Sequence, residues 1–217
     1  MHYIVSLRSK FPTSRIWLRK EDYKSAFRRL HLDSRTAMES AVIVEIEKNN
    51  YLVISLRMPF GGAPCPSEFA LLTDIITDTI NDLLNDDNWD NNTIFSKTFY
   101  DIPEPITLSD SIKFAQARSM SVQVPLDVCG KADVFIDDVI SCCVDINNNL
   151  DRLYKAPCTV IDAVAREGKS SGVQRDPMIE KSKLIAEGAA EETKIILGWL
   201  IDTRRLKISL PKHKFIA

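Results

Sequence analysis

The sequence lacks the features that would place the chain in or across a membrane. None of its 217 residues form the roughly 18-residue uncharged apolar stretch that a membrane span requires. The first ten residues include Arg8 and Lys10 and contain no apolar core of signal-peptide length. We therefore expect an intracellular chain, in the cytoplasm or nucleus, that has no membrane partner.

The chain also lacks the cysteine and histidine spacing of disulfide frameworks and zinc sites. None of its five cysteines forms a CxxC pair, and the adjacent Cys142 and Cys143 suit neither a simple bridge nor a zinc knuckle. The three histidines are too scattered along the chain to indicate a metal site. Free thiols in a reducing compartment are the simplest interpretation.

There is little excess of charge of either sign, since 28 Lys and Arg residues face 30 Asp and Glu residues. Nucleic-acid-binding proteins usually carry a basic excess, so this balance argues at first against such a partner. The distribution of charge changes that interpretation. Residues 74–110 hold nine acidic residues and one lysine, whereas residues 1–21 and 203–217 are both strongly basic. The total therefore does not exclude a nucleic-acid partner.

The pattern along the first half predicts a mixture of strands and helices. Residues 14–21 read as a strand that leads to Asp22, and residues 24–32 as a short helical stretch. Residues 41–47 and 51–58 alternate apolar and polar side chains around a turn at 48–50, which predicts a hairpin. Residues 59–66 are rich in Pro and Gly and predict a loop. A helix is expected from an N-cap at Ser67 to Leu84, with the apolar face Leu71, Leu72, Ile75, Ile76, Ile80 and Leu83.

The second half continues this mixed order and predicts the α+β class. Residues 85–132 are irregular and are expected to form a long surface insertion. Residues 132–136 and 139–144 predict two strands joined by a tight turn that carries Asp137 and Asp138. A helix over 150–167, interrupted at Pro157, and a second helix over 178–193 follow. Residues 194–201 and 206–210 predict a closing hairpin.

The adjacent carboxylates of Asp137 and Asp138 are the first candidate site. Like charges this close raise one pKa unless a cation neutralises them, and the surrounding residues are apolar. A divalent ion with oxygen ligands, such as Mg²⁺, fits this setting, and Asp22 at a strand end could supply a third carboxylate. The alternative is that both aspartates are only turn residues, which Asp often is.

Four motifs in order make the chain resemble the reverse transcriptases, most closely those of gypsy-type and DIRS-type retrotransposons. Residues Asp22 to Phe27 resemble the first palm motif of this family. Residues Met58 to Phe69 resemble its second motif, which is usually written LPFGLxxAPxxF. The aromatic-x-Asp-Asp box resembles Phe135 to Asp138. The FLG stretch and its trailing LPxxK resemble Ile196 to Trp199 and Ser209 to Lys214. The matches span residues 22 to 214 in the family's order.

This resemblance implies a single domain over 1–217: a polymerase palm with an antiparallel sheet backed by helices, partial fingers and a closing primer-grip hairpin. It implies two Mg²⁺ ions, with Mn²⁺ as an alternative, held by Asp22, Asp137 and the Tyr23 carbonyl, with Asp138 in support. The implied partners are an RNA or DNA template with its primer and deoxynucleoside triphosphates. The implied activity is nucleotidyl transfer to the primer 3′-OH.

The resemblance also implies roles for residues around the carboxylates, and each has a plainer alternative. Phe27 would exclude a ribose 2′-OH, or be an ordinary packed aromatic. Phe60 and Gly61 would lie beside the nucleotide, or form only a Pro/Gly turn; the residues Gly62 to Cys65 depart from the family pattern. The expected primer grip consists of Leu197, Gly198 and Trp199, although Trp199 could be a core residue. Lys181 would be a general acid for the leaving pyrophosphate, or a solvated lysine.

The length indicates a palm-centred fragment that other segments of a retroelement polyprotein would complete. Only 21 residues precede Asp22, and the basic residues Arg8, Lys10, Arg15, Arg19 and Lys20 are the candidates for triphosphate contacts there. The alternative function is a catalytically inactive retroelement remnant that folds and binds nucleic acid without extending a primer.

Overall fold

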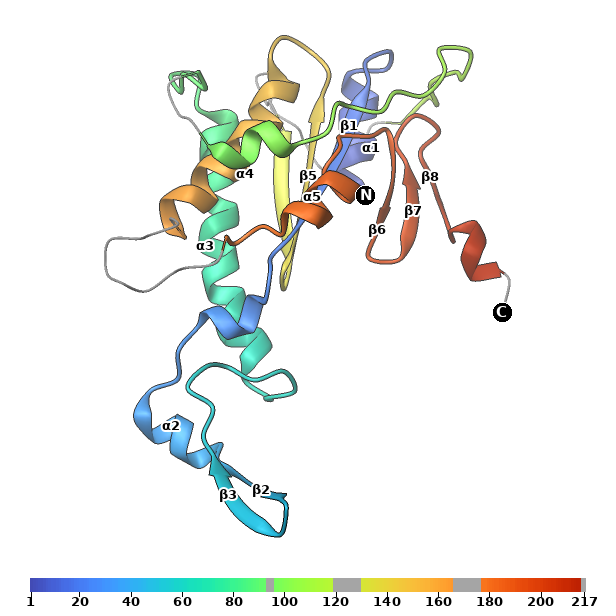
Figure 1. Cartoon of the computed structure of the whole chain (residues 1–217). Coiled ribbons are helices and arrows are strands. Elements are labelled where there is room, and N and C mark those ends of the chain that lie inside the picture. Colours follow the sequence, from blue (N-terminus) through green and yellow to red (C-terminus); the bar gives the residue numbers. More distant parts are fainter. Residues whose placement is uncertain (93–95, 119–129, 166–176, 216–217) are drawn as a thin grey trace.

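A computed structural model describes residues 1–92, 96–118, 130–165 and 177–215 of the chain (Figure 1). The fold is α+β, with small antiparallel sheets and helices packed against them, as expected from the sequence. The central sheet has the order β1-β5-β4 and comprises β1 (Ile16–Asp22), β5 (Asp138–Val144) and β4 (Gly130–Phe135). The predicted strand before Asp22 and the predicted strand-turn-strand unit around Asp137 are both confirmed.

Both faces of β1 are buried over its first four residues, of which Ile16, Trp17 and Leu18 are apolar. Ile16 and Leu18 lie on one face, in a core with Leu7 of α1 (His2–Lys10) and Ile196. Trp17 lies on the other face with Leu153 of α4 (Asn149–Val164). Side chains alternate between the faces of a strand, so Cys142 and Cys143 enter different cores and cannot bridge to each other.

Two long helices cover one side of the central sheet. α3 (Cys65–Asn85) packs against β4 and α4, and its buried side chains include Phe69, Ile76, Ile80 and Leu84. The predicted N-cap at Ser67 is wrong, because the helix begins at Cys65 and its N-cap is Pro64, three residues earlier than predicted. Two of the six residues of the predicted apolar face are also wrong, since Leu71 and Ile75 are more than 60% exposed. α4 runs through Pro157 without the predicted interruption.

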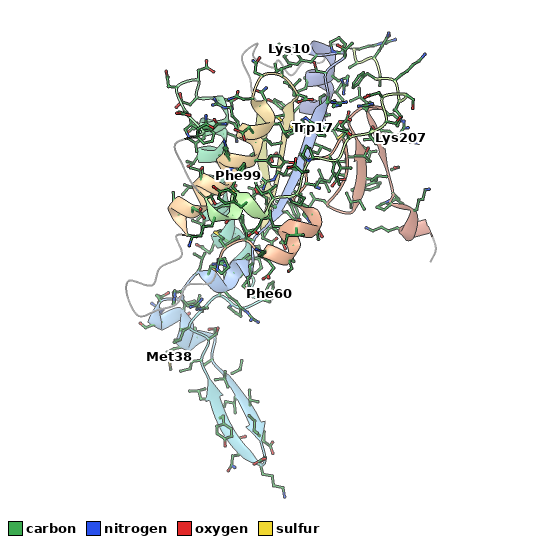
Figure 2. All side chains as sticks on the ribbon, turned by 45° about the horizontal axis from the view of Figure 1, so that its top comes forward. Lys10, Trp17, Met38, Phe60, Phe99 and Lys207 are labelled. Atoms are coloured by element: carbon green, nitrogen blue, oxygen red, sulfur yellow. The ribbon has the colours of Figure 1, made fainter. Side chains whose placement is uncertain are left out.

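A hairpin extends away from the rest of the chain (Figures 1 and 2). It consists of β2 (Val42–Ile46) and β3 (Asn49–Val53), and it follows η1 (Ala26–Arg29) and α2 (Ser34–Glu39). Its turn is formed by Glu47 and Lys48, both with positive φ, rather than by the predicted residues 48–50. Every residue of the two strands is exposed, so the alternating pattern predicted the hairpin but not its environment.

Most of the described part of the predicted insertion is an irregular strap, although Asn85 belongs to α3 and residues 130–132 belong to β4. After η2 (Lys97–Asp101), residues 102–118 cross from α4 toward the C-terminal sheet (Figure 1). The guanidinium groups of Arg8 and Arg204 each lie 4.7 Å from the Phe114 ring centroid, and Arg204 donates to the Ser109 carbonyl at 2.8 Å. These contacts fasten the strap to the body. Residues 93–95 and 119–129 of the predicted insertion lie outside the described residues.

The C-terminal part is a three-stranded meander of β6 (Thr193–Ile196), β7 (Trp199–Asp202) and β8 (Lys207–Ser209), followed by η3 (Lys212–Phe215). Residues 194–201 are therefore not one strand, because Leu197 and Gly198 form a turn with φ values of 49° and 81°. The predicted helix over 178–193 is also shorter than expected. α5 covers only Lys181–Glu187 and ends at Gly188, before the chain enters β6.

Candidate functional site

The three candidate carboxylates come together at one end of the central sheet. Asp22 is the last residue of β1, and it pairs in register with Asp138, the first residue of β5. The Tyr23 amide donates to the Asp137 carbonyl at 3.1 Å, which ties the chain after β1 to the β4–β5 turn. The motifs at residues 22 and 137–138, far apart in sequence, therefore meet across one strand pair.

The β4–β5 turn places the two adjacent aspartates differently. Ile136 and Asp137 form the turn, whereas Asp138 belongs to β5 and pairs with Phe135. Ile136 has a φ of 59°, which is an uncommon conformation for a β-branched residue. Its side chain packs against the core that contains Ile76 and Ile80 of α3, so this packing offsets the backbone strain. Asp137 is thus a turn residue, as one of the two interpretations of the sequence predicted. The turn nevertheless lies beside Asp22, because the Tyr23 amide donates to the Asp137 carbonyl.

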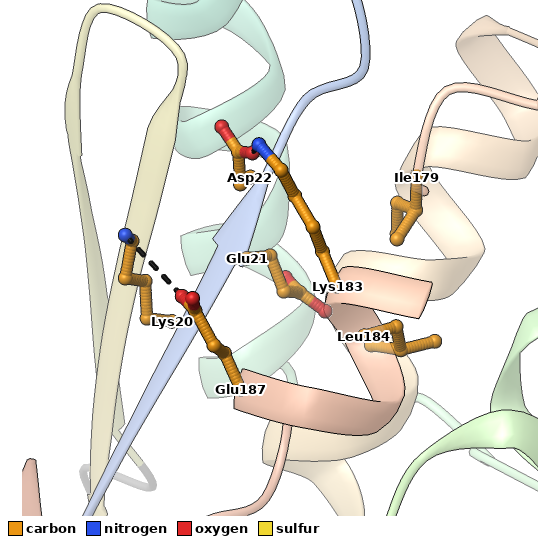
Figure 3. A pocket seen from close by; sticks show the side chains of 7 residues that line it. All are labelled: Lys20, Glu21, Asp22, Ile179, Lys183, Leu184 and Glu187. Carbon is orange, nitrogen blue, oxygen red and sulfur yellow. Dashed lines mark hydrogen bonds and ion pairs between the residues drawn. The ribbon is translucent and has the colours of Figure 1, made fainter. Parts of the chain in front are cut away.

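Two lysines neutralise this group of carboxylates. The Lys20 ammonium lies 3.1 Å from an Asp138 carboxylate oxygen and 3.6 Å from Glu187 of α5. The Lys183 ammonium, also from α5, forms an ion pair with Asp22 (Figure 3). A small pocket between β1 and α5 is lined by Lys20, Glu21, Asp22, Ile179, Lys183, Leu184 and Glu187. The acidic end of the sheet is therefore already supplied with positive charge by the chain itself.

The electrostatics of the site follow from burial and these ion pairs. Burial raises the pKa of Asp137, and the nearby charges of Asp22 and Asp138 raise it further. Burial opposes ionisation of Lys20, but its hydrogen bond to Asp138 and the surrounding carboxylates outweigh this, so its pKa is raised. The hydrogen bond to Asp22 raises the pKa of Lys183. Asp137 is thus a carboxylate whose charged form is disfavoured by its surroundings.

The donor chemistry of this site can be compared with the ligands that Mg²⁺ requires. Carboxylate oxygens and the Tyr23 carbonyl are the hard oxygen donors that Mg²⁺ prefers. The positive charge beside two of the carboxylates comes from the ammonium groups of Lys20 and Lys183. Within the residues that the structure describes, however, no three His, Cys, Asp or Glu side chains are grouped closely enough to hold a metal ion. The residue types are those that bind Mg²⁺ or Mn²⁺. In the structure, however, Lys183 pairs with Asp22 and Lys20 pairs with Asp138.

The expected nucleotide-binding aromatics lie together near this end of the sheet. Phe27 is buried, and its ring contacts Phe60 edge-on with centroids 5.2 Å apart and Phe69 at 5.6 Å. Phe60 is 65% exposed and has the Arg28 guanidinium 6.0 Å from its ring centroid. Gly61 has a φ of 88°, a conformation that favours glycine. Phe27 is therefore a packed core aromatic, which was the plainer of its two interpretations, and Phe60 is the exposed ring of the pair.

The expected primer-grip residues occupy the tip of the β6–β7 hairpin. Leu197 and Gly198 form its turn, and Trp199 begins β7 with half of its surface exposed. The alternative of Trp199 as a core residue is therefore wrong. The Lys214 ammonium reaches the Gly198 carbonyl at 3.3 Å, which brings a basic side chain to this tip.

Lys181 does not reach the carboxylates. It is 65% exposed and pairs with Asp101 of η2 at 2.6 Å, whereas Lys183 contacts Asp22. Lys183 was missed because it follows Lys181 by two residues in a short helix, and only tertiary packing distinguishes the two. Lys20 was among the basic residues that the sequence singled out. Residues two apart on a strand share a face, and Lys20 precedes Asp22 by two, so both lie on the same face of β1.

The basic residues of the N-terminal segment are engaged in structural contacts. Arg8 and Arg19 are fully buried, and Arg15 forms an ion pair with Asp110 at 3.0 Å. Arg19 pairs with Glu21 on the face of β1 opposite to Lys20 and Asp22. Of these N-terminal candidates for triphosphate contacts, Lys20 is the one that the structure places beside the carboxylates.

Comparisons with known proteins add no family assignment. A scan against protein-family models found no match, and a search of curated proteins found none either. None of the helices in the described ranges is both long enough and apolar enough to cross a membrane.

Proposed function

We propose that the chain is the palm of an RNA-directed DNA polymerase that adds deoxynucleotides to a primer 3′-OH. The observation that carries the proposal is the meeting of Asp22 with Asp137 and Asp138 across the β1–β5 pair. Carboxylates at one end of an antiparallel sheet backed by helices are what the motif resemblance requires. The adjacent aromatics and the exposed hairpin tip at Trp199 add supporting surfaces.

In this proposal the chain's residues position the reactants and supply charge. Asp22, Asp137 and the Tyr23 carbonyl would hold Mg²⁺, and Asp138 would support the pair from the first position of β5. When bound, the metal would lower the pKa of the primer hydroxyl and neutralise the triphosphate. Lys183 replaces Lys181 as the candidate proton donor for the leaving pyrophosphate, because it is the lysine that contacts Asp22.

The remaining residues would define where the nucleotide and primer lie. Phe60, with Phe27 behind it, would contact the incoming nucleotide, and Gly61 would let the backbone approach it closely. Leu197, Gly198 and Trp199 would contact the primer. RNA or DNA templates and deoxynucleoside triphosphates are the proposed partners, and other segments of a retroelement polyprotein would extend these surfaces.

Primer extension on an RNA template with Mg²⁺ tests the proposal. We expect extension by the unmodified chain and its loss in Asp137→Asn. Asp133→Asn is the matched control, because Asp133 lies on β4, is exposed and accepts a hydrogen bond from the neighbouring Val134 amide. Full extension by the Asp137→Asn protein would refute the proposal.

A second candidate function is nucleic-acid binding without polymerisation, as in an inactive remnant. Two observations favour it. Asp22 and Asp138 are both paired with lysines. The described residues also contain no group of three His, Cys, Asp or Glu side chains that could hold a metal ion. In that case template binding would persist in Asp137→Asn and no extension would occur under any divalent ion. Extension by the unmodified chain would eliminate this candidate.

A further inference from the structure

The two lysines at the carboxylate end are held in unequal ways. Lys20 belongs to the central sheet, its side chain is only 20% exposed, and it bridges Asp138 and Glu187. Lys183 projects from the short helix α5, its side chain is 58% exposed, and its ion-pair partner is Asp22. A half-buried pair within a sheet is fixed, whereas an exposed lysine side chain can move at little cost.

We propose that Lys183 is a displaceable internal counter-ion, which occupies Asp22 until a divalent cation takes its place. The inference rests on the proposed function, since it assigns Asp22 as a metal ligand. Lys183 is the lysine that pairs with Asp22, the carboxylate that the proposed function assigns to the metal. The lysine neutralises the carboxylate that would otherwise be free, and so sets the affinity of the site for the metal.

The helix also provides a place for the released ammonium group. Glu187 follows Lys183 by four residues on α5, so the two side chains lie on the same face of the helix. Glu187 already attracts Lys183 electrostatically and contacts Lys20 at 3.6 Å. Withdrawal of Lys183 from Asp22 toward Glu187 therefore leaves no buried charge unpaired. Lys20 has its own partner in Asp138, at 3.1 Å, and does not depend on Lys183 for it.

The direct test is Mn²⁺ binding by calorimetry or electron paramagnetic resonance. We expect Lys183→Met to bind Mn²⁺ about two- to fivefold more tightly, which is the range for release of an exposed ion pair. Lys181→Met is the matched control, because it removes the same charge from the same helix but from a pair with Asp101. Lys183→Arg keeps the charge and should bind as the unmodified chain does.

Equal or weaker Mn²⁺ binding by Lys183→Met than by the unmodified chain would overturn the inference, and so would equal tightening by Lys181→Met. These results differ from failure of the proposed function, in which no variant shows Mn²⁺ binding that depends on Asp137. A second measurement needs no substitution at Lys183. Amine-reactive labelling of the unmodified chain should increase at Lys183, but not at Lys181, when Mg²⁺ is added. Unchanged labelling of Lys183 at saturating Mg²⁺ would contradict the exchange.

Discussion

Replacement of Arg19 by Met should destabilise the fold more than any loss of a surface ion pair. Arg19 and Glu21 share one face of β1, and their side chains are 0% and 1% exposed. Arg19 also donates to the Gly188 carbonyl at 3.1 Å and to the Leu153 carbonyl at 3.2 Å. It therefore joins the strand that ends at Asp22 to α4 and to the end of α5.

The expected loss follows from what the substitution leaves behind. Removal of one partner of a buried ion pair typically costs about 3–5 kcal/mol, because the other charge stays buried and unpaired. The Arg19→Met/Glu21→Leu double variant removes that charge and should recover part of the loss. Recovery should be incomplete, since the carbonyls of Gly188 and Leu153 still lack their donor.

Urea unfolding followed by circular dichroism measures this free energy. Arg35→Met is the matched control, because it breaks an exposed pair with Glu39 at 2.9 Å and should cost less than about 1 kcal/mol. The reasoning fails if Arg19→Met costs no more than Arg35→Met, or if the double variant is no more stable than the single one.

The pH dependence gives a further check on Glu21. Burial raises the pKa of Glu21, and the charge of Arg19 opposes this shift. A raised pKa means that the folded state binds the proton more tightly than the unfolded state. Its contribution to stability is therefore greatest below the ordinary pKa and is lost as pH rises through the raised one. Without Arg19 the pKa rises further, so Arg19→Met should regain stability relative to the unmodified chain as pH falls from 8 to 5.

Three other predictions concern the core, the thiols and a helix cap. Ile80→Ala should cost about 2–5 kcal/mol in urea unfolding because Ile80 is fully buried, whereas Leu71→Ala, 62% exposed on the same helix, should change stability by only about 0.5 kcal/mol. Burial raises the pKa of Cys142 and of Cys158 to about 12, so peptide mapping after iodoacetamide treatment at pH 8 should find both unmodified in the folded protein and modified after unfolding. Hydrogen bonds from Thr36 lower the pKa of Asp33, the N-cap of α2, so the cap should persist below the ordinary pKa and be lost as pH falls through the lowered one. The protection of the Thr36 amide from hydrogen exchange, relative to an unstructured chain, should fall with that loss. In Asp33→Asn this protection should no longer change over the same pH range.

The elements with strong local patterns were predictable from the sequence. The apolar residues Ile16 to Leu18 and the apolar strands around Asp137 predicted β1, β4 and β5, and the order of the motifs indicated which of them meet. The turns were less predictable, because Glu47, Lys48, Ile136 and Leu197 adopt positive φ without the Gly or Asn that usually marks it. The predicted strand over 194–201 therefore concealed a turn at Leu197 and Gly198.

Tertiary packing decided the features that the pattern could not. Leu71 and Ile75 have the helical spacing of core residues, but α3 buries the neighbouring stripe that contains Phe69 and Thr73. Which of Lys181 and Lys183 reaches Asp22 depends on the rotation of α5 against β1, and no local signal specifies that rotation. The buried Arg19–Glu21 pair could not be predicted either, because four consecutive charged residues on a strand usually indicate exposure to solvent.

The central claim is that Asp22 and Asp137 together form a divalent-cation site at the end of the β1–β5 pair. Anomalous diffraction from crystals soaked in Mn²⁺ tests it most directly. We predict an anomalous peak between the Asp22 and Asp137 carboxylates, with the Lys183 ammonium withdrawn from Asp22. Bound Mn²⁺ only at other positions, with Lys183 still paired to Asp22, would contradict the account.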